Sequence, residues 1–310
     1  DLILATDMLD LATFCGISRL DPSIPRIVYF HENQLTYPWS PTDPDPALKR
    51  DNHYSWINFT SSLAADHVLF NSNFHLQEFL DALGGYLDQF PDHHNKHEIS
   101  TIRRRSSVLH LGIDLPGFSE KERGAKPIFL WNHRWEYDKN PDLFFNTLFS
   151  LQDSGFDFGL IVLGKKYGRV PEIFSVAKSK LKDKILQFGS VESREEYLDW
   201  VSKAHFIPVS SNQDFFGGSV VEAISSGVFP ILPKRLAYPE HIPAAYHQEV
   251  FYTSEDEFFV RLKDLFEVGY QTRIAQDLSQ FVARYDWKNS ITKYDDLFEK
   301  LKNAKSLHLS

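Results

Sequence analysis

The second half of the chain alternates short apolar runs with amphipathic segments in a regular order. The apolar runs, which read as strands, lie at 127–132, 158–163, 185–188, 205–209, 229–232 and 249–252. Helical patterns lie at 141–153, 171–181, 194–203, 218–226, 255–267 and 271–284. Strict strand–helix alternation predicts an α/β fold with a parallel sheet covered by helices on both faces. Ligands of such sheets bind beyond the carboxyl ends of the strands, so we expect a site in the loops that follow them.

The first half shows the same alternation less regularly. Strands are expected at 1–5, 26–30, 67–70 and 107–111, with helices at 51–63 and 74–83. Ser72 or Asn73 could cap the second of these helices. The stretch 84–100 is polar and is expected to be irregular, and 116–126 has the composition of a linker between domains. A length of 310 residues is enough for two domains with separate cores.

Residues 214–227 contain a glycine-rich turn that opens a helix. Gly217, Gly218 and Ser219 leave free backbone N–H groups at the positive helix end, which suits a phosphate. Glu222 lies one turn inside the helix, where its two oxygens could bind a pair of ribose hydroxyls. Asp214, on the loop before the turn, could bind hydroxyls of a second sugar. A phosphate between two sugars describes a nucleotide-sugar.

A second loop carries two cations. Arg134 and Lys139 follow the apolar strand that ends at Trp131, and the next helix is expected to begin with Asn140 as N-cap and Pro141 at its first position. Such a pair can bind a diphosphate and stabilise the charge that develops as it departs.

Composition limits the class of protein. Hydrophobic residues make up 42% of the chain and charged residues 24%, which is typical of a globular protein in water. No apolar run is long enough to cross a membrane. The single cysteine, Cys15, fits a reducing compartment, and we expect a cytoplasmic protein. His93, His94 and His97 match no zinc pattern, so no metal site is expected. The net charge of −9 argues mildly against nucleic-acid binding, although Arg103, Arg104 and Arg105 form a local basic cluster.

These motifs resemble those of family-4 glycosyltransferases of the GT-B fold. Arg134 with Lys139, the segment from Asp214 through Gly217 and Glu222 to Gly227, and 111–114 carry the resemblance. The first carboxylate of the motif is usually Glu in that family and is Asp214 here. Further motifs, at 31–38, 70–72, 133–139 and 238–240, resemble the tRNA-queuosine mannosyltransferases within this group.

The resemblance implies two Rossmann-like domains whose parallel sheets face a central cleft. We expect an acceptor-side domain at 1–118, a donor-binding domain at 119–285 and a C-terminal helix at 286–310 that returns toward the first domain. Because the chain opens on a strand already inside an α/β unit, the first domain is expected to lack about 50–70 residues at its N-terminus.

The resemblance also implies a retaining transfer of mannose from GDP-mannose to queuosine in a tRNA anticodon loop, with no metal ion or other cofactor. The residues expected to be catalytic are His31, Glu32, Arg134, Lys139 and Asp214. The residues expected to bind the donor are Arg134, Lys139, Gly164, Phe188, Asp214, Phe216, Gly217, Gly218, Ser219 and Glu222. The residues expected to bind the acceptor are His31, Asn33, Gln34 and Tyr37.

Several interpretations remain open at this stage. Glu32 could orient the acceptor, assist removal of its proton or form a structural salt bridge. The aromatic residues Tyr37, Trp39, Tyr54 and Trp56 could stack on bases or have a core or surface role. Rival functions are a glycosyltransferase acting on a lipid or polysaccharide, a nucleotide-sugar epimerase, and a non-catalytic RNA-binding module derived from such an enzyme. Oligomeric state is not encoded in these patterns.

Overall fold

A computed structural model describes residues 1–40, 53–120, 126–166, 168 and 170–307. They divide into two compact units, one formed by Asp1–Gly112 with Ser290–Ser310 and the other by Ile113–Asn289. The division falls before the expected boundary at 118, because Ile113 is hydrogen-bonded within the second unit. Its N–H donates to the carbonyl of Tyr285 at 2.8 Å, and its carbonyl accepts from the N–H of Trp287 at 3.0 Å.

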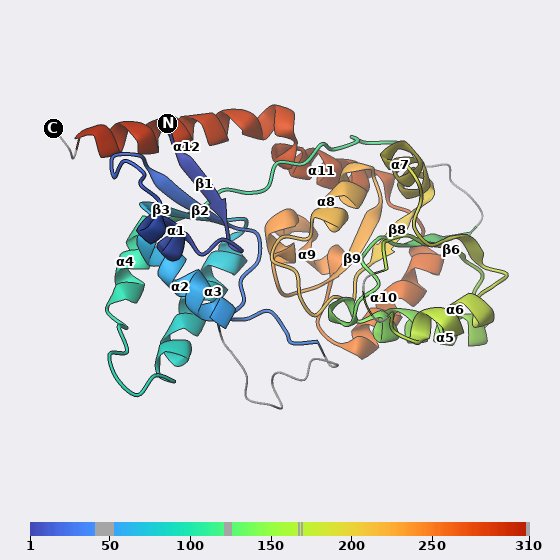
Figure 1. Cartoon of the computed structure of the whole chain (residues 1–310). Coiled ribbons are helices and arrows are strands. Elements are labelled where there is room, and N and C mark those ends of the chain that lie inside the picture. Colours follow the sequence, from blue (N-terminus) through green and yellow to red (C-terminus); the bar gives the residue numbers. More distant parts are fainter. Residues whose placement is uncertain (41–52, 121–125, 167, 169, 308–310) are drawn as a thin grey trace. The chain divides into compact units, whose positions relative to one another are not determined.

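The first unit is built on a parallel sheet with strand order β1-β2-β3-β4 (Figure 1). Its strands are β1 (Ile3–Thr6), β2 (Arg26–Phe30), β3 (His67–Phe70) and β4 (Ser106–Val108). Its helices are α1 (Leu11–Ile17), α2 (His53–Ala64), α3 (Asn73–Leu87), α4 (Glu98–Arg105) and the greater part of α12 (Trp287–Leu307). Ser72 caps α3 by accepting from the N–H of His75.

Alternation along the strands gives this sheet two apolar faces. Val28, Phe30 and Phe70 belong to a core cluster that also contains residues of α1 to α4, and Cys15 packs against this cluster. Tyr29 and Leu69 point to the other face, where Tyr294 and Phe298 of α12 cover them. Figure 1 accordingly shows α12 on the side of the sheet opposite α2 and α3.

The expectation that 84–100 is irregular was wrong at both ends. α3 continues to Leu87 through Gly84 and Gly85, since Tyr86 and Leu87 are buried and their packing outweighs the low helix propensity of glycine. α4 begins at Glu98 and buries Ile102. The aromatic helix expected at 51–63 is α2, and its first two expected positions lie outside the described residues, as do residues 41–50 before it.

The second unit contains a parallel sheet with strand order β10-β9-β8-β5-β6-β7. Its strands are β5 (Ile128–Trp131), β6 (Gly159–Val162), β7 (Ile185–Phe188), β8 (Phe206–Pro208), β9 (Phe229–Pro233) and β10 (Phe251–Tyr252). Its helices are α5 (Pro141–Asp153), α6 (Ile173–Lys180), α7 (Arg194–Lys203), α8 (Gly218–Ser225), α9 (His247–Val250), α10 (Glu255–Val268) and α11 (Thr272–Val282). The parallel α/β fold predicted from the alternation is confirmed.

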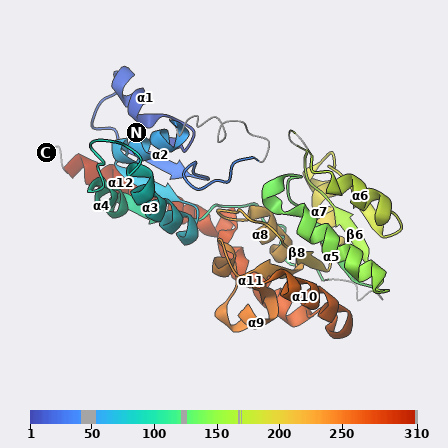
Figure 2. The same cartoon turned by 90° about the horizontal axis from the view of Figure 1, so that it is seen from below.

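Helices cover both faces of this sheet. α5 contacts α6 and α10, while α8 contacts α11. Figure 1 shows α5, α6 and α10 on one side of the sheet and α8 and α11 on the other, and Figure 2 views the first group from below. The predicted Asn140 cap of α5 is confirmed, because its side chain accepts from the N–H of Leu143 and Pro141 follows at the first turn. The strand expected at 249–252 is only Phe251–Tyr252, since α9 occupies the preceding residues.

Candidate active site

Two loops of the second unit, both following central strands of its sheet, are hydrogen-bonded to each other. The loop after β5 ends in a short 3₁₀ turn at Tyr137–Lys139. The backbone N–H groups of Asn212 and Gln213, from the loop after β8, donate to the carbonyl of Asp138. The hydroxyl of Ser210 donates to the carbonyl of Lys139 at 2.9 Å. The two motifs identified in the sequence therefore meet at adjacent strand ends, β5 and β8.

Lys139 is enclosed by acceptors from both loops. Its ammonium group lies 3.1 Å from Oδ2 of Asp138, 3.2 Å from Oδ1 of Asp214 and 2.6 Å from the carbonyl oxygen of Gln213. Its side chain is only 8% exposed. A buried ammonium with three donors and three acceptors is fixed in place, so Lys139 determines where Asp214 lies.

Asp214 receives a second contact from Tyr238, whose hydroxyl donates to its Oδ2 at 2.6 Å. Burial alone would raise the pKa of Asp214, but the charge of Lys139 and the hydrogen bonds from Tyr238 and Lys139 outweigh it and lower that pKa. Asp214 is therefore ionised at neutral pH and can accept further hydrogen bonds. Tyr238 lies in the short turn Tyr238–His241, which the sequence flagged only as part of a motif.

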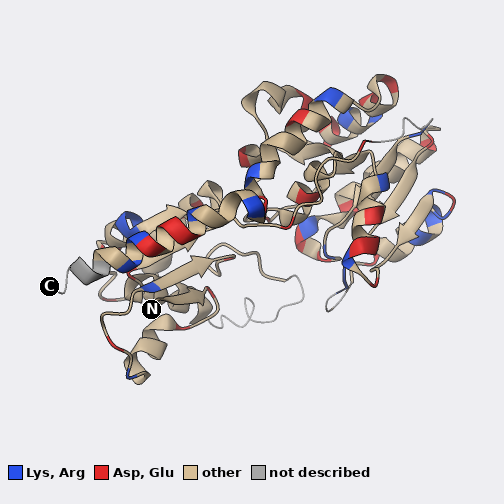
Figure 3. Cartoon of the chain, turned by 90° about the horizontal axis from the view of Figure 1, so that it is seen from above, with Lys and Arg blue, Asp and Glu red and all other residues tan. Residues whose placement is uncertain are grey.

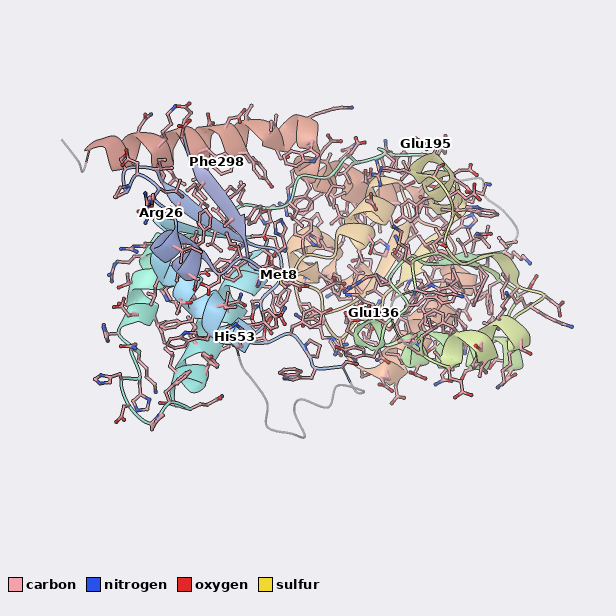
Figure 4. All side chains as sticks on the ribbon, viewed as in Figure 1. Met8, Arg26, His53, Glu136, Glu195 and Phe298 are labelled. Atoms are coloured by element: carbon pink, nitrogen blue, oxygen red, sulfur yellow. The ribbon has the colours of Figure 1, made fainter. Side chains whose placement is uncertain are left out.

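Arg134 lies at the more exposed side of the same cluster. Its guanidinium contacts Glu136 at 3.2 Å and Oδ2 of Asp138 at 3.9 Å, and its side chain is 46% exposed. Figure 4 labels Glu136. Since Arg134 and Lys139 both approach the same Asp138 oxygen, the structure brings the two predicted diphosphate ligands together.

Gly217 and Gly218 open α8 as predicted. Gly217 is the N-cap with φ +80° and has no side chain to cap the helix. Its carbonyl accepts from the N–H groups of Val220 and Val221, and the N–H groups of Gly218 and Ser219 precede these at the start of the helix. A Cβ on Gly217 would lie 3.0 Å from the ring of Tyr238, and the positive φ would strain any other residue, so both features favour glycine here.

His133 links the two predicted motifs. Its Nδ1 lies 3.2 Å from the hydroxyl of Ser219 in the first turn of α8. Its Nε2 is buried and has no hydrogen-bond partner among the described residues. Burial lowers the pKa of His133 to about 4, with Asp214 opposing the shift and Lys139 adding to it. His133 is thus neutral at physiological pH. The sequence did not suggest that His133 would connect the two motifs.

Glu222, expected to bind ribose, lies one turn into α8 and is already paired. Its Oε1 is 2.8 Å from Arg194 at the start of α7, and its Oε2 accepts from the hydroxyl of Tyr197 at 3.2 Å. Asn132, at the end of β5, donates to the hydroxyl of Tyr197 and to the carbonyl of Ser219. The sequence did not predict that Arg194, Tyr197 and Asn132 belong to the site. An Arg and a Tyr three positions apart on a helix have the pattern of ordinary surface residues, and a single Asn after a strand has no distinctive pattern.

The three other predicted donor residues are packed against protein. Gly164 has φ +109°, and a Cβ there would lie 2.0 Å from the carbonyl oxygen of His133, so this glycine permits the loop after β5 to approach. Phe188 packs edge-on against Trp135 at 5.1 Å between ring centroids. The carbonyl of Phe216 accepts from Nε2 of His241 at 2.5 Å, which fixes the loop before α8. Their contact with a nucleotide stays a prediction.

The predicted acceptor residues gather after β2 in the first unit. His31 is about 43% exposed, its backbone N–H donates to Asp7 at 3.0 Å, and its Nδ1 lies 3.7 Å from the same carboxylate. Gln34 donates to Glu32 at 3.2 Å. Tyr37 is half-buried.

Asn33 is fully buried, and its side-chain oxygen accepts from the N–H groups of Leu35 and Thr36. It therefore shapes the turn that presents its neighbours. Direct contact of these residues with an acceptor stays a prediction.

Comparisons with known proteins identify relatives that are named as mannosyltransferases. The family model for the N-terminal part of tRNA-queuosine alpha-mannosyltransferase matches residues 1–113. The chain is 32% identical to a tRNA-queuosine alpha-mannosyltransferase of Drosophila melanogaster over 96% of its own length and 80% of the relative. It is 26% identical, over 62% of its length and 52% of the relative, to a GDP-mannose:cellobiosyl-diphosphopolyprenol alpha-mannosyltransferase of Xanthomonas oryzae.

Solved structures share the fold. A sucrose-phosphate synthase from Thermosynechococcus elongatus superposes with a TM-score of 0.72 at 15% identity, over 98% of this chain and 74% of that one. Anabaena HepE in complex with UDP superposes with a TM-score of 0.66 at 13% identity, over 97% and 79%. These neighbours are GT-B glycosyltransferases, so the predicted GT-B fold is confirmed. In the described part of the chain, no helix combines the length and apolarity that a membrane span requires.

Proposed function

The chain belongs to the tRNA-queuosine alpha-mannosyltransferase family of glycosyltransferases, and we propose that it transfers mannose from GDP-mannose to queuosine in the anticodon loop of a tRNA. The observation that carries this proposal is the convergence of Arg134, Lys139, the open N-terminus of α8 and Glu222 in one unit. Identity to the Drosophila relative extends over 96% of the chain and so includes this unit.

The donor is held by its diphosphate in this proposal. The N–H groups that open α8 bind one phosphate, and Arg134 approaches from the exposed side. As the bond from the sugar to the diphosphate breaks, negative charge grows on the departing oxygen, and the nearby cations and helix end stabilise it. Lys139 contributes its charge from a buried position, where screening by water is weak.

Asp214 is suited to orient the transferred sugar. Its carboxylate is fixed by Lys139 and Tyr238, which leaves acceptor positions for sugar hydroxyls. The shorter Asp at a position where Glu is usual places these acceptors one methylene further from the hexose. Mannose and guanine are supported by the Xanthomonas relative, whose printed name includes GDP-mannose.

We propose a retaining transfer, in which an alpha-linked donor gives an alpha-linked product; both relatives are named alpha-mannosyltransferases. The acceptor hydroxyl then attacks the face that the diphosphate leaves, and its proton passes to an oxygen of the leaving phosphate. No separate carboxylate base is required. His31 and Glu32 are proposed to orient the acceptor hydroxyl, with Gln34 and Tyr37 beside them.

The test is transfer of label to RNA. The protein is incubated with queuosine-containing tRNA and with labelled GDP-mannose, GDP-fucose, UDP-glucose or UDP-N-acetylglucosamine. We expect label on RNA with GDP-mannose alone, and none on the same tRNA carrying guanosine in place of queuosine. Transfer is expected to persist in EDTA, because protein cations supply the charge that a metal would. Label on a polyprenyl diphosphate-linked sugar but not on RNA would replace this acceptor with a lipid.

The proposed compartment is the cytoplasm, where tRNA modification would supply the acceptor. Localisation of a fluorescent fusion of the full-length protein, followed by fractionation, tests this. Signal confined to a membrane or organelle fraction would contradict it.

A further inference from the structure

The side chain of Glu222 is held by two protein contacts, unlike a carboxylate exposed on a helix surface. Arg194 contacts its Oε1 at 2.8 Å and Tyr197 donates to its Oε2 at 3.2 Å, so each oxygen has one protein partner. The side chain is 13% exposed. An ionised carboxylate offers about four acceptor positions, two on each oxygen. One position on each oxygen therefore stays open to a ligand with two neighbouring hydroxyls.

The partners of Glu222 are themselves fixed by backbone or by neighbouring side chains. The Arg194 amino group that contacts Glu222 also donates to the carbonyl of Asp114 at 2.6 Å, so its two hydrogens have one acceptor each. Asn132 donates to the hydroxyl of Tyr197 at 3.1 Å, which directs the single hydrogen of that hydroxyl toward Glu222. Asn132 also donates to the Ser219 carbonyl at 2.8 Å and so joins the network to α8.

These contacts join four segments of the second unit, one of which is the loop after β5 that begins with Asn132. Arg194 and Tyr197 come from the first turn of α7, in which Glu195 is labelled in Figure 4, while Glu222 comes from α8. Asp114 lies in the segment that leads into the second unit. The hydroxyl of Tyr197 stays protonated at neutral pH because burial and the Glu222 carboxylate raise its pKa. All members of the network thus keep fixed donor and acceptor roles.

We propose that Arg194 and Tyr197 are positioning residues for ribose recognition, which hold the Glu222 carboxylate in place so that its open acceptor positions receive both ribose hydroxyls of the nucleotide. This inference rests on the proposed function, since it assigns Glu222 to the ribose of the donor. Neither residue needs to touch the nucleotide. They restrict the orientation of the Glu222 side chain before the nucleotide binds. Less conformational entropy is then lost on binding.

The experiment measures the affinity for GDP and for 2′-deoxy-GDP by titration calorimetry, and compares their ratio between variants. A hydrogen bond to a charged acceptor corresponds to about ten-fold or more in affinity, so wild-type protein is expected to prefer GDP by about that factor. In Arg194→Met and in Tyr197→Phe, we expect this preference to fall to about three-fold or less. Arg194→Lys keeps the charge and should recover part of the preference.

The matched control is Arg261→Met, which removes another Arg–Glu contact of the same unit, at 3.3 Å from Glu257 on α10. It should leave the preference unchanged. Thermal melting of every variant shows whether a lost affinity reflects unfolding, which would weaken both nucleotides equally. A double variant, Arg194→Met with Glu222→Gln, should show no further loss of preference beyond Glu222→Gln alone, because the two residues act as one unit.

Two results would overturn the inference. An unchanged preference in Arg194→Met would show that Glu222 orients itself, and tighter binding of GDP would show that Arg194 competes with ribose for Glu222. UDP and ADP are titrated alongside. If wild-type protein binds none of these diphosphates at millimolar concentration, the donor site and this inference fail together, whereas binding with an unchanged preference rejects the inference alone.

Discussion

At the scale of single residues, burial separates the two cations of the candidate site. Lys139 is 8% exposed and contacts two carboxylates, whereas Arg134 is 46% exposed on the outer side of the same cluster. Removing one partner of a buried ion pair leaves an uncompensated charge, which is far more costly than removing an exposed one. Lys139 and Arg134 have the same proposed role in donor binding, but substituting them is expected to change the stability of the protein by different amounts.

We predict that Lys139→Met lowers the free energy of unfolding by about 3–5 kcal/mol, since Asp138 and Asp214 lose their buried cation. Arg134→Met should cost no more than about 1 kcal/mol. Both should reduce transfer by about 100-fold or more, because each removes positive charge from the leaving diphosphate. Urea denaturation and a transfer assay on the same preparations measure the two effects. Equal stability of the two variants would contradict the buried position of Lys139.

His133 predicts how stability depends on pH. Its folded-state pKa is about 4 and its ordinary value is 6.5, so between these values the unfolded chain binds a proton that the folded chain does not. Lowering the pH from 6.5 to 4 should therefore decrease the free energy of unfolding by about 3 kcal/mol through this residue. His75, whose pKa burial lowers to about 3, acts in the same direction.

The measurement is denaturation of wild-type protein and of His133→Gln at a series of pH values between 7 and 4. The variant should lose less stability on acidification, since it has no imidazole to protonate. His97→Gln, at a side chain that is 77% exposed, is the control and should follow the wild-type curve. Parallel curves for His133→Gln and wild type would mean that His133 is hydrated in solution.

At the scale of elements, the loop after β5 depends on one glycine from the loop after β6. Gly164→Ala would place a Cβ 2.0 Å from the His133 carbonyl oxygen, in addition to the strain of a left-handed φ. We predict a loss of more than about 3 kcal/mol and loss of donor binding, because the His133 to Lys139 loop must move.

Gly155→Ala is the comparison for this prediction. Gly155 also has positive φ, but a Cβ there meets nothing within 4 Å, so only the backbone strain of about 1–2 kcal/mol is expected. Melting temperatures and nucleotide affinity of both variants separate strain from collision. If both variants behaved alike, the close approach of the two loops would be wrong.

The same loops show what sequence can and cannot predict. The Asn140 cap, the glycine turn at Gly217 and the cations at Arg134 and Lys139 are local patterns, and each was predicted from residues close together in the chain. The contacts of Tyr238 with Asp214, and of Arg194 with Glu222, join residues 24 and 28 positions apart. These contacts depend on which strands are neighbours in the sheet, and the hydrophobic periodicity of a sequence does not predict strand order.

At the scale of the whole molecule, the acidic net charge is distributed rather than concentrated. In Figure 3, acidic (red) and basic (blue) residues alternate along the ribbon of α12. In the basic cluster of α4, Arg104 donates to Ser100 and Thr101, and Arg105 donates to the carbonyls of Leu63 and Ala65. These partners are neutral, so both arginines keep their positive charge, and α4 carries a local basic cluster in a chain whose net charge is −9. Because the whole chain is acidic, recognition of the proposed tRNA acceptor is expected to depend mainly on contacts at the modified base.

The two units of the chain give a final prediction, because the proposed donor residues all lie within Ile113–Asn289 whereas α12 completes the first unit. Phe298 packs against the face of the first sheet that contains Tyr29 and Leu69. It is labelled in Figure 4. Phe298→Asp would bring a carboxylate into this apolar layer and should cost the first unit about 3 kcal/mol or more. Phe298→Leu, which stays apolar, should cost less than about 1.5 kcal/mol.

GDP affinity of Phe298→Asp should stay within about two-fold of the wild-type value, since a substitution outside the second unit shares no partner with the donor residues. Transfer to tRNA should fall, because the acceptor residues around His31 follow β2 of the destabilised sheet. Calorimetric titration with GDP, set beside a transfer assay and a melting curve, gives all three values. Loss of GDP binding in step with the first unit's unfolding would mean that the second unit depends on the first for its fold. The donor site could then not be assigned to one unit alone.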